Sequence, residues 1–277
     1  LLVATITPVP RGNIYLKPQY THYIQTALST NNRETFSYFS MYLSGNITTR
    51  STVQASWMDD SGVRYAIPVN SLKPQTTGSA YIGYSRPVTK DRLLTLQIGG
   101  SASYSSGTSY QAKSRLEGLD LQSFDYNTFM EDFWGDASGD RFYSGQSGFA
   151  ESRTNTLVWS GDFKLKYSID KLDASLTYST SNRVSRYSLD PTANLNNWTH
   201  HINSNLLYRP GKDWEIGSDL TYRFYRGYAN GFGLPEWRWN MSVNKSIKSV
   251  TLGLKVADIL NQTRNMTRTM SAEYVED

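Results

Sequence analysis

The chain has 277 residues, with 28 Lys and Arg, 24 Asp and Glu, 3 His and no Cys, which excludes disulfide frameworks, thiolate metal sites and cysteine nucleophiles. A mean hydropathy of −0.52 excludes a bundle of membrane-spanning helices, since each needs about 20 apolar residues. The net charge of +4 comes from basic residues scattered along the chain, so nucleic acid is not expected as a partner. Leu1–Arg11 shows no signal-peptide pattern, and we expect a mature or truncated product.

Alternation of apolar and polar residues is the dominant pattern. Between Leu94 and Tyr104 the even positions are apolar or small, and the odd ones are Thr, Gln, Gly or Ser. Between Trp214 and Phe224 the even positions are again mostly apolar, and the odd positions include Glu215, Asp219 and Arg223. A period of two with one apolar face is typical of β-strands. The pattern predicts about ten strands, at residues 20–28, 35–57, 77–86, 92–106, 156–168, 172–187, 198–209, 213–226, 237–246 and 250–261.

Strand length and the alternation of turns distinguish two all-β folds. Most expected strands exceed the usual ~5–6 residues and match the ~9–11 that cross a bilayer obliquely. Tight polar turns at 87–91, 169–171, 210–213 and 247–249 alternate with longer connections, above all 107–155. Aromatic residues lie at both strand ends: Tyr84, Tyr167, Tyr208 and Trp214 beside the short turns, and Tyr104, Tyr178, Trp198, Phe224 and Trp237 toward the long connections. This favours an antiparallel transmembrane β-barrel with a long extracellular loop over a soluble β-sandwich.

Two segments resemble TonB-dependent outer-membrane receptors, in particular the barrel family common in Bacteroidota. Gly12–His22 resembles the family's Gly-Asn-Pro-x-Leu-Lys-Pro-Glu segment, with Ile14 in place of the usual proline. Asn240–Ser246 and the following Thr251–Gln262 are similar to the penultimate hairpin of the family, and Asp-Ile-Leu-Asn-Gln at 258–262 is the more specific motif.

The resemblance implies that residues 1–277 form the C-terminal part of a barrel of about 22 strands, of which about ten are present. The N-terminal plug domain and the last strand of such receptors are then absent from this sequence. The implied function is TonB-dependent uptake of an extracellular nutrient, without catalysis and without a cofactor. The implied partners are outer-membrane lipid, the plug, the TonB system and a surface lipoprotein. A self-contained small pore or adhesin, or a soluble carbohydrate-binding sandwich, stays open as an alternative.

The long connection is acidic and aromatic, whereas the rest of the chain is basic. Aromatic faces beside carboxylates suit stacking on a sugar or enclosing a cationic or amphiphilic ligand, and an extracellular loop that folds over itself uses similar aromatics. Asp132, Asp136 and Asp140 offer oxygen ligands, but their spacing does not match a calcium loop, so no metal site is predicted. The candidate ligand-binding residues are Phe124, Tyr126, Asp132, Phe133, Trp134, Asp136, Asp140 and Arg141.

The polar faces of the later strands form a second group of candidates. In a barrel these side chains face the lumen, where they contact a plug or a substrate, or are satisfied by one another and by water. The group consists of Asp162, Lys164, Lys166, Glu215, Asp219, Arg223 and Arg238.

The remaining motifs predict structural roles. His200 and His201 are adjacent on one strand, so they point to opposite faces and cannot chelate one ion together. Asp258 and Asn261 are expected to stabilise a turn at a strand end, because Asp and Asn side chains bond readily to nearby backbone.

Overall fold

A computed structural model describes residues 9–10, 16–58, 63–112, 149–211, 213–228, 233–262, 269–270 and 275–276. They form one sheet of 13 strands and a separate two-stranded sheet of β14 (Thr269–Met270) and β15 (Val275–Glu276). Most strands of the large sheet follow one another as antiparallel neighbours: β2 (Tyr20–Asn32), β3 (Ser37–Thr49), β6 (Gln75–Pro87), β7 (Leu94–Ala112), β8 (Phe149–Ile169), β9 (Leu172–Tyr187), β10 (Leu195–Tyr208), β11 (Trp214–Arg226), β12 (Glu236–Ile247) and β13 (Val250–Val256).

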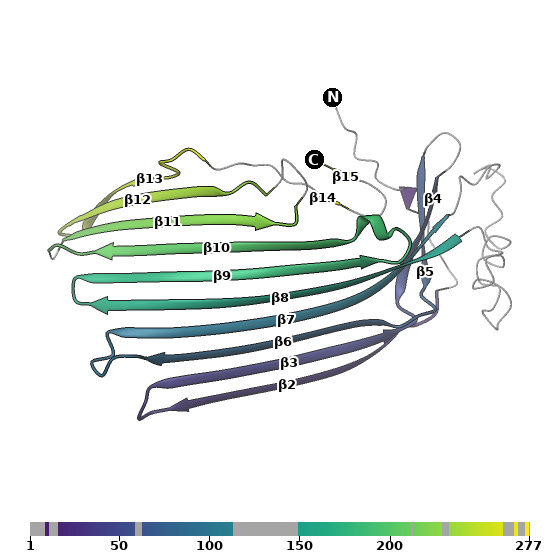
Figure 1. Ribbon diagram of the computed structural model, residues 1–277, viewed down its shortest axis with the longest axis horizontal. Coiled ribbons are helices and arrows are strands. Elements are labelled where there is room, and N and C mark those ends of the chain that lie inside the picture. The colour runs from purple at the N-terminus through teal and green to yellow at the C-terminus, as the bar shows by residue number, and fades with distance from the viewer. Residues whose placement is uncertain are drawn as a thin grey trace.

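These strands form one curved, open sheet (Figure 1). Among the described residues β2 pairs only with β3, and β13 pairs only with β12, so the sheet has two free edges and does not close. The predicted all-β antiparallel architecture is confirmed, and most of the expected strands overlap observed ones.

Five short turns that join sequential antiparallel neighbours of the large sheet lie at one end of it, on the left in Figure 1. They join β2 to β3, β6 to β7, β8 to β9, β10 to β11 and β12 to β13. Phe36, Arg92 and Lys248 adopt positive φ in three of them, which makes the reversals tight. Asp91 accepts hydrogen bonds from the Thr89 hydroxyl and the Leu93 N–H, which lower the pKa of its carboxyl. The predicted alternation of short and long connections is therefore confirmed.

One face of this sheet is apolar and exposed. Ile24 is 71% exposed on β2 and Leu254 is 68% exposed on β13, and every strand between them also presents large apolar side chains. Cross-strand register places the nine aromatic residues predicted for the strand ends on this face; Trp159 stacks edge-on against Trp198 at 4.8 Å. No second sheet covers this face within the described ranges, so the β-sandwich alternative is wrong.

The two adjacent histidines lie on opposite faces, as predicted. His200 lies on the apolar face, where its ring stacks on Phe224 at 4.4 Å and its Nδ1 lies 2.9 Å from the Tyr178 hydroxyl. His201 pairs in register with Arg223 on the polar face.

Two predicted strand boundaries are wrong. The strand expected over 35–57 is two strands, because Arg50 adopts a φ of 52° between β3 and β4 (Thr52–Met58). The strand expected over 250–261 ends at Val256, since Asp258 and Asn261 have φ values of 49° and 50°. Asp258 Oδ1 accepts a hydrogen bond from the Gln262 N–H at 3.3 Å, which confirms the predicted turn-stabilising role of Asp258.

A hairpin of β4 and β5 (Arg64–Asn70) stands at the end of the sheet opposite the short turns (Figure 1). It pairs in parallel with β7 and with β1 (Val9–Pro10). It contains most of the buried apolar residues of the described chain: Ile67 and Ala55 are fully buried, Trp57 stacks on Tyr65 at 5.6 Å, and Tyr110 of β7 packs among them.

Hydrogen bonds of the buried Asn70 side chain connect this hairpin to the turn between β3 and β4 and to the segment before β2. Its amide donates to the carbonyls of Lys17 and Arg50 at 2.8 and 2.7 Å, and its oxygen accepts the Lys17 N–H at 2.7 Å. Lys73 Nζ adds an ion pair to Glu151 Oε1 of β8 at 2.6 Å.

Helical structure is limited to η1 (Pro191–Ala193) in the described chain, and none of it has the length and hydropathy of a membrane-crossing helix. Asp190 caps η1 by accepting from the Thr192 N–H and hydroxyl, and these hydrogen bonds lower the pKa of its carboxyl.

Candidate functional site

The polar face of the sheet carries the candidate site. Register places Asp162, Lys164 and Lys166 of β8 opposite Ser179, Thr177 and Ser175 of β9. The same face continues through Asn203 and Asn205 of β10 to Asp219 of β11 and Asn240 of β12. The structure thus brings all seven residues predicted for the polar face onto one surface: Asp162, Lys164, Lys166, Glu215, Asp219, Arg223 and Arg238.

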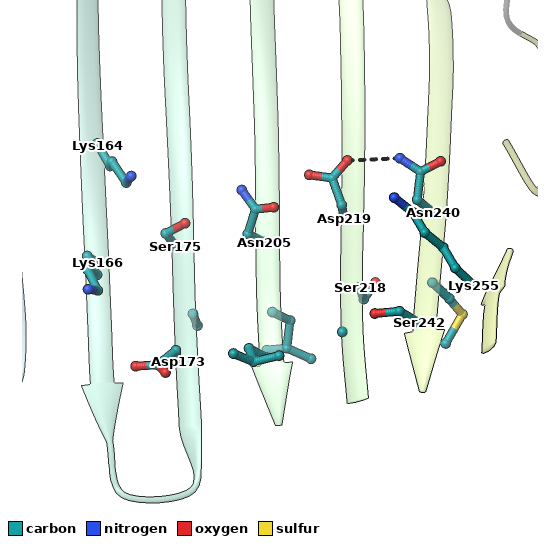
Figure 2. A pocket seen from close by; sticks show the side chains of 15 residues that line it. Lys164, Lys166, Asp173, Ser175, Asn205, Ser218, Asp219, Asn240, Ser242 and Lys255 are labelled. Carbon is teal, nitrogen blue, oxygen red and sulfur yellow. Dashed lines mark hydrogen bonds between the residues drawn. The ribbon is translucent and has the colours of Figure 1, made fainter. Parts of the chain in front are cut away.

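A hollow of about 560 Å³ lies on this face across β8 to β13 (Figure 2). The side chains around it come from β8, β9, β10, β11, β12 and β13 (Figure 2). Its polar lining consists of Lys164, Lys166, Asp173, Ser175, Asn205, Ser218, Asp219, Asn240, Ser242 and Lys255.

Asparagine amides hold the Asp219 carboxylate in this hollow. Asn203 Nδ2 donates to Asp219 Oδ2 at 2.9 Å, and Asn240 Nδ2 donates to Asp219 Oδ1 at 3.3 Å. Asn203 Nδ2 also lies 2.9 Å from the hydroxyl of buried Thr221. Each oxygen of the carboxylate therefore has a donor from a neighbouring strand, and this network fixes the position of Asp219.

An ionic chain crosses the sheet near the short turns. Arg209 contacts Asp173 at 2.8 Å and Glu215 at 3.5 Å, and so links the ends of β9, β10 and β11. Farther along the face, Arg223 contacts Glu236 at 3.4 Å. Because these side chains are partly solvated, each pair contributes about 1 kcal/mol or less and mainly sets the charge pattern of the surface.

Three lysines in the hollow are left without such a partner. Lys164, Lys166 and Lys255 form no ion pair with any described carboxylate, whereas Asp173, Asp219, Glu215 and Glu236 all have donors. The Lys166 ammonium interacts electrostatically with Asp173 at longer range, so Lys164 and Lys255 are the ammonium groups of the hollow best placed to bind carboxylate or phosphate oxygens.

The other candidate residues lie outside the described residues. These are Phe124, Tyr126, Asp132, Phe133, Trp134, Asp136, Asp140 and Arg141. Within the described part of the chain, no three His, Asp or Glu side chains gather closely enough to hold a metal ion.

Sequence reasoning missed several residues in and around the hollow. Asn203, Asn205 and Asn240 follow the alternation of their strands, and the same pattern that selected Asp219 could have found them. Asp173 and Arg209 stand at strand ends, where alternation no longer determines the direction of a side chain; only the register of β9 with β10 brings them together.

Comparison with known proteins identifies a family and a similar solved structure. A family model described as "Outer membrane protein beta-barrel family" matches residues 6–183 and 174–277. The crystal structure of the Pseudomonas putida toluene transporter TodX is similar at 10% identity over 87% of this chain and 74% of that chain, with a TM-score of 0.31. No curated protein matches the sequence.

Proposed function

Because the chain belongs to the outer membrane protein β-barrel family, and is therefore an outer-membrane protein, we propose that it forms part of the wall of a TonB-dependent receptor that imports an extracellular nutrient. The apolar face of the sheet meets lipid, and the polar face lines the lumen. The long connection near residues 107–155 is proposed to lie on the extracellular side and to capture the ligand, since such barrels have short periplasmic turns and long outer loops.

The observation that carries this proposal is the pair of free edges. A lipid-exposed sheet edge leaves backbone N–H and C=O groups unpaired, at a cost of several kcal/mol for each group, and does not occur in a bilayer. Pairing β2 and β13 with further strands satisfies both edges. A barrel of about 22 strands is wide enough to hold a plug, and residues 1–277 form its C-terminal portion.

The lysines of the charged hollow are suited to contact a plug domain. Lys164, Lys166 and Lys255 present ammonium groups on the lumen side, complementary to carboxylates on the surface of a folded domain inside the barrel. The TonB system acts on this receptor indirectly, through the plug. No catalytic step is assigned to the barrel, which binds and conducts.

An antibody raised against residues 116–152 tests the proposal in the native organism. An immunoblot of the outer-membrane fraction is expected to give a band far heavier than 31.4 kDa, the mass of this chain, and intact cells are expected to bind the antibody. A band near 31.4 kDa in that fraction would contradict the receptor and support a small pore or adhesin. Staining only after permeabilisation would contradict the extracellular position of the loop.

A further inference from the structure

Three arginines lie on the apolar face of the sheet, at the end opposite the short turns. Arg226 of β11 stands opposite Trp198 of β10 in register, so it shares the face of that ring. Arg186 of β9 stands opposite Asn155 of β8, and Asn155 and Arg153 continue the alternation that puts the odd positions of β8 on this face. We call Arg153, Arg186 and Arg226 the arginine row.

The guanidinium groups of the arginine row have no carboxylate partner in the described chain. Arg153 Nε donates to the Ser106 hydroxyl at 3.1 Å. The side chains of Arg186 and Arg226 are exposed, and they form no hydrogen bond or ion pair with a described residue. A guanidinium has five N–H donors in a fixed planar fork, so most of these donors stay available to a ligand outside the protein.

The opposite end of the same face is built differently. Lys245 of β12 lies there beside the short turns, where its ammonium pairs with Asp213 at 3.5 Å and lies 4.9 Å from the ring centre of Trp214. At the end that carries the arginine row, the Glu151 carboxylate is already bound to Lys73 at 2.6 Å. Within strands β8 to β12 as described, the unpaired cations of the apolar face therefore lie only at the end opposite the short turns.

An aromatic band borders the arginine row on this face. Trp159 packs edge-on against Trp198, the register neighbour of Arg226, at 4.8 Å. The next ring along β10, His200, stacks on Phe224 at 4.4 Å and interacts electrostatically with Arg226. Tryptophan rings of membrane proteins gather at the level of the lipid headgroups, so arginines beside this band lie at the depth of lipid phosphates.

We propose that the arginine row binds the phosphate groups of an outer-leaflet lipid, namely a bisphosphorylated glycolipid. The guanidinium fork matches phosphate oxygens in bidentate geometry, and it is less strongly hydrated than an ammonium. Because the three arginines come from β8, β9 and β11, they suit a wide headgroup with more than one phosphate better than one small ion. The inference rests on the proposed function in taking the apolar face as the lipid face and the long connection as extracellular.

Polar side chains between the arginines fit the sugar part of such a headgroup. Asn155 of β8 and Asn196 of β10 lie on the same face as the row. Their side-chain oxygens accept hydrogen bonds from the Tyr104 hydroxyl at 3.1 Å and from Asn182 Nδ2 at 2.8 Å. Each side-chain amide therefore keeps its N–H donors for the hydroxyls of a sugar.

Binding of fluorescently labelled diphosphoryl lipid A to the full-length protein in detergent tests this inference. The unchanged protein is expected to bind the labelled lipid, and unlabelled lipid A without its phosphates is expected to compete poorly. Arg153→Gln, Arg186→Gln and Arg226→Gln are each expected to weaken binding about fivefold, the factor that one basic residue near an anionic headgroup contributes. Heat-modifiable mobility in gels verifies that each variant is folded.

Two controls match these variants. Arg183→Gln changes the polar face of the same strand as Arg186, and Lys245→Gln changes the short-turn end of the apolar face; both are expected to keep the affinity. The inference would be overturned by an unchanged protein that does not bind the lipid, or by three arginine variants that all keep its affinity. Equal competition by lipid A without phosphates, or by inorganic phosphate alone, would likewise overturn the phosphorylated headgroup as the ligand.

This assay needs neither a plug nor energy, so it separates the inference from the proposed function. Arginine-dependent lipid binding together with an immunoblot band near 31.4 kDa would overturn the receptor alone. A heavier band from a protein whose lipid binding ignores the arginine row would overturn this inference alone.

Discussion

Ile202→Arg is expected to destabilise the folded protein in lipid by about 2–4 kcal/mol and to reduce its assembly in the outer membrane. Ile202 lies on the apolar face of β10, between Trp198 and Tyr208, and its register neighbours are Tyr178 and Tyr222. An arginine at this depth would have to hold its charge in hydrocarbon or reach the headgroups.

The matched control is Asn205→Arg, on the polar face of the same strand. Its register neighbour is Asp219, which offers the new cation a partner, so a change within about 1 kcal/mol is expected. Urea titration of the full-length protein in vesicles, followed by heat-modifiable mobility in gels, compares the two. Equal destabilisation by both variants would contradict the orientation of the sheet.

Ile67→Ala is expected to destabilise the β4–β5 hairpin by about 2–5 kcal/mol, because it leaves a cavity in a fully packed site. Ile67 is fully buried with Trp57 and Tyr110, in the only cluster of the described residues where large apolar side chains are removed from both water and lipid. Hydrogen exchange is expected to accelerate at the amides of β4 and β5 and to stay slow in β9, β10 and β11.

The control for this site is Ile24→Ala on β2. That side chain is 71% exposed on the apolar face, so lipid fills the space that it leaves and the change is expected to cost less than about 1 kcal/mol. A larger effect of Ile24→Ala than of Ile67→Ala would show that the hairpin is not the packed core of this part of the molecule.

The regular strands could be predicted because each has one apolar and one polar face. The alternation of apolar and polar residues did not predict a strand whose two faces are both buried. Tyr65, Ala66 and Ile67 of β5 are consecutive and all buried, and Pro68 argues against a strand, so the hairpin was missed. The break between β3 and β4 is invisible because Val53, Ala55 and Trp57 continue the odd-numbered apolar phase of β3 across it.

The residues of the candidate site could likewise be predicted only in part. Alternation shows that Lys164 and Asp219 point to the polar side of their strands, but only register brings them into one hollow. The absence of Lys, Arg, Asp and Glu from the inward-facing positions of β2, β3, β6 and β7 likewise becomes visible only once the strands are paired in register.

We expect the charged face of the sheet to line an aqueous lumen and the opposite face to meet lipid. The chain has no cysteine, so single substitutions Asn203→Cys, Ser204→Cys, Asn205→Cys and Leu206→Cys can be labelled in isolated outer membranes with a hydrophilic maleimide. Fast labelling is predicted at 203 and 205 and protection at 204 and 206; Ser204 is the sharper test, because a polar residue faces lipid there. Labelling of 204 and 206 as fast as 203 and 205 would contradict the account.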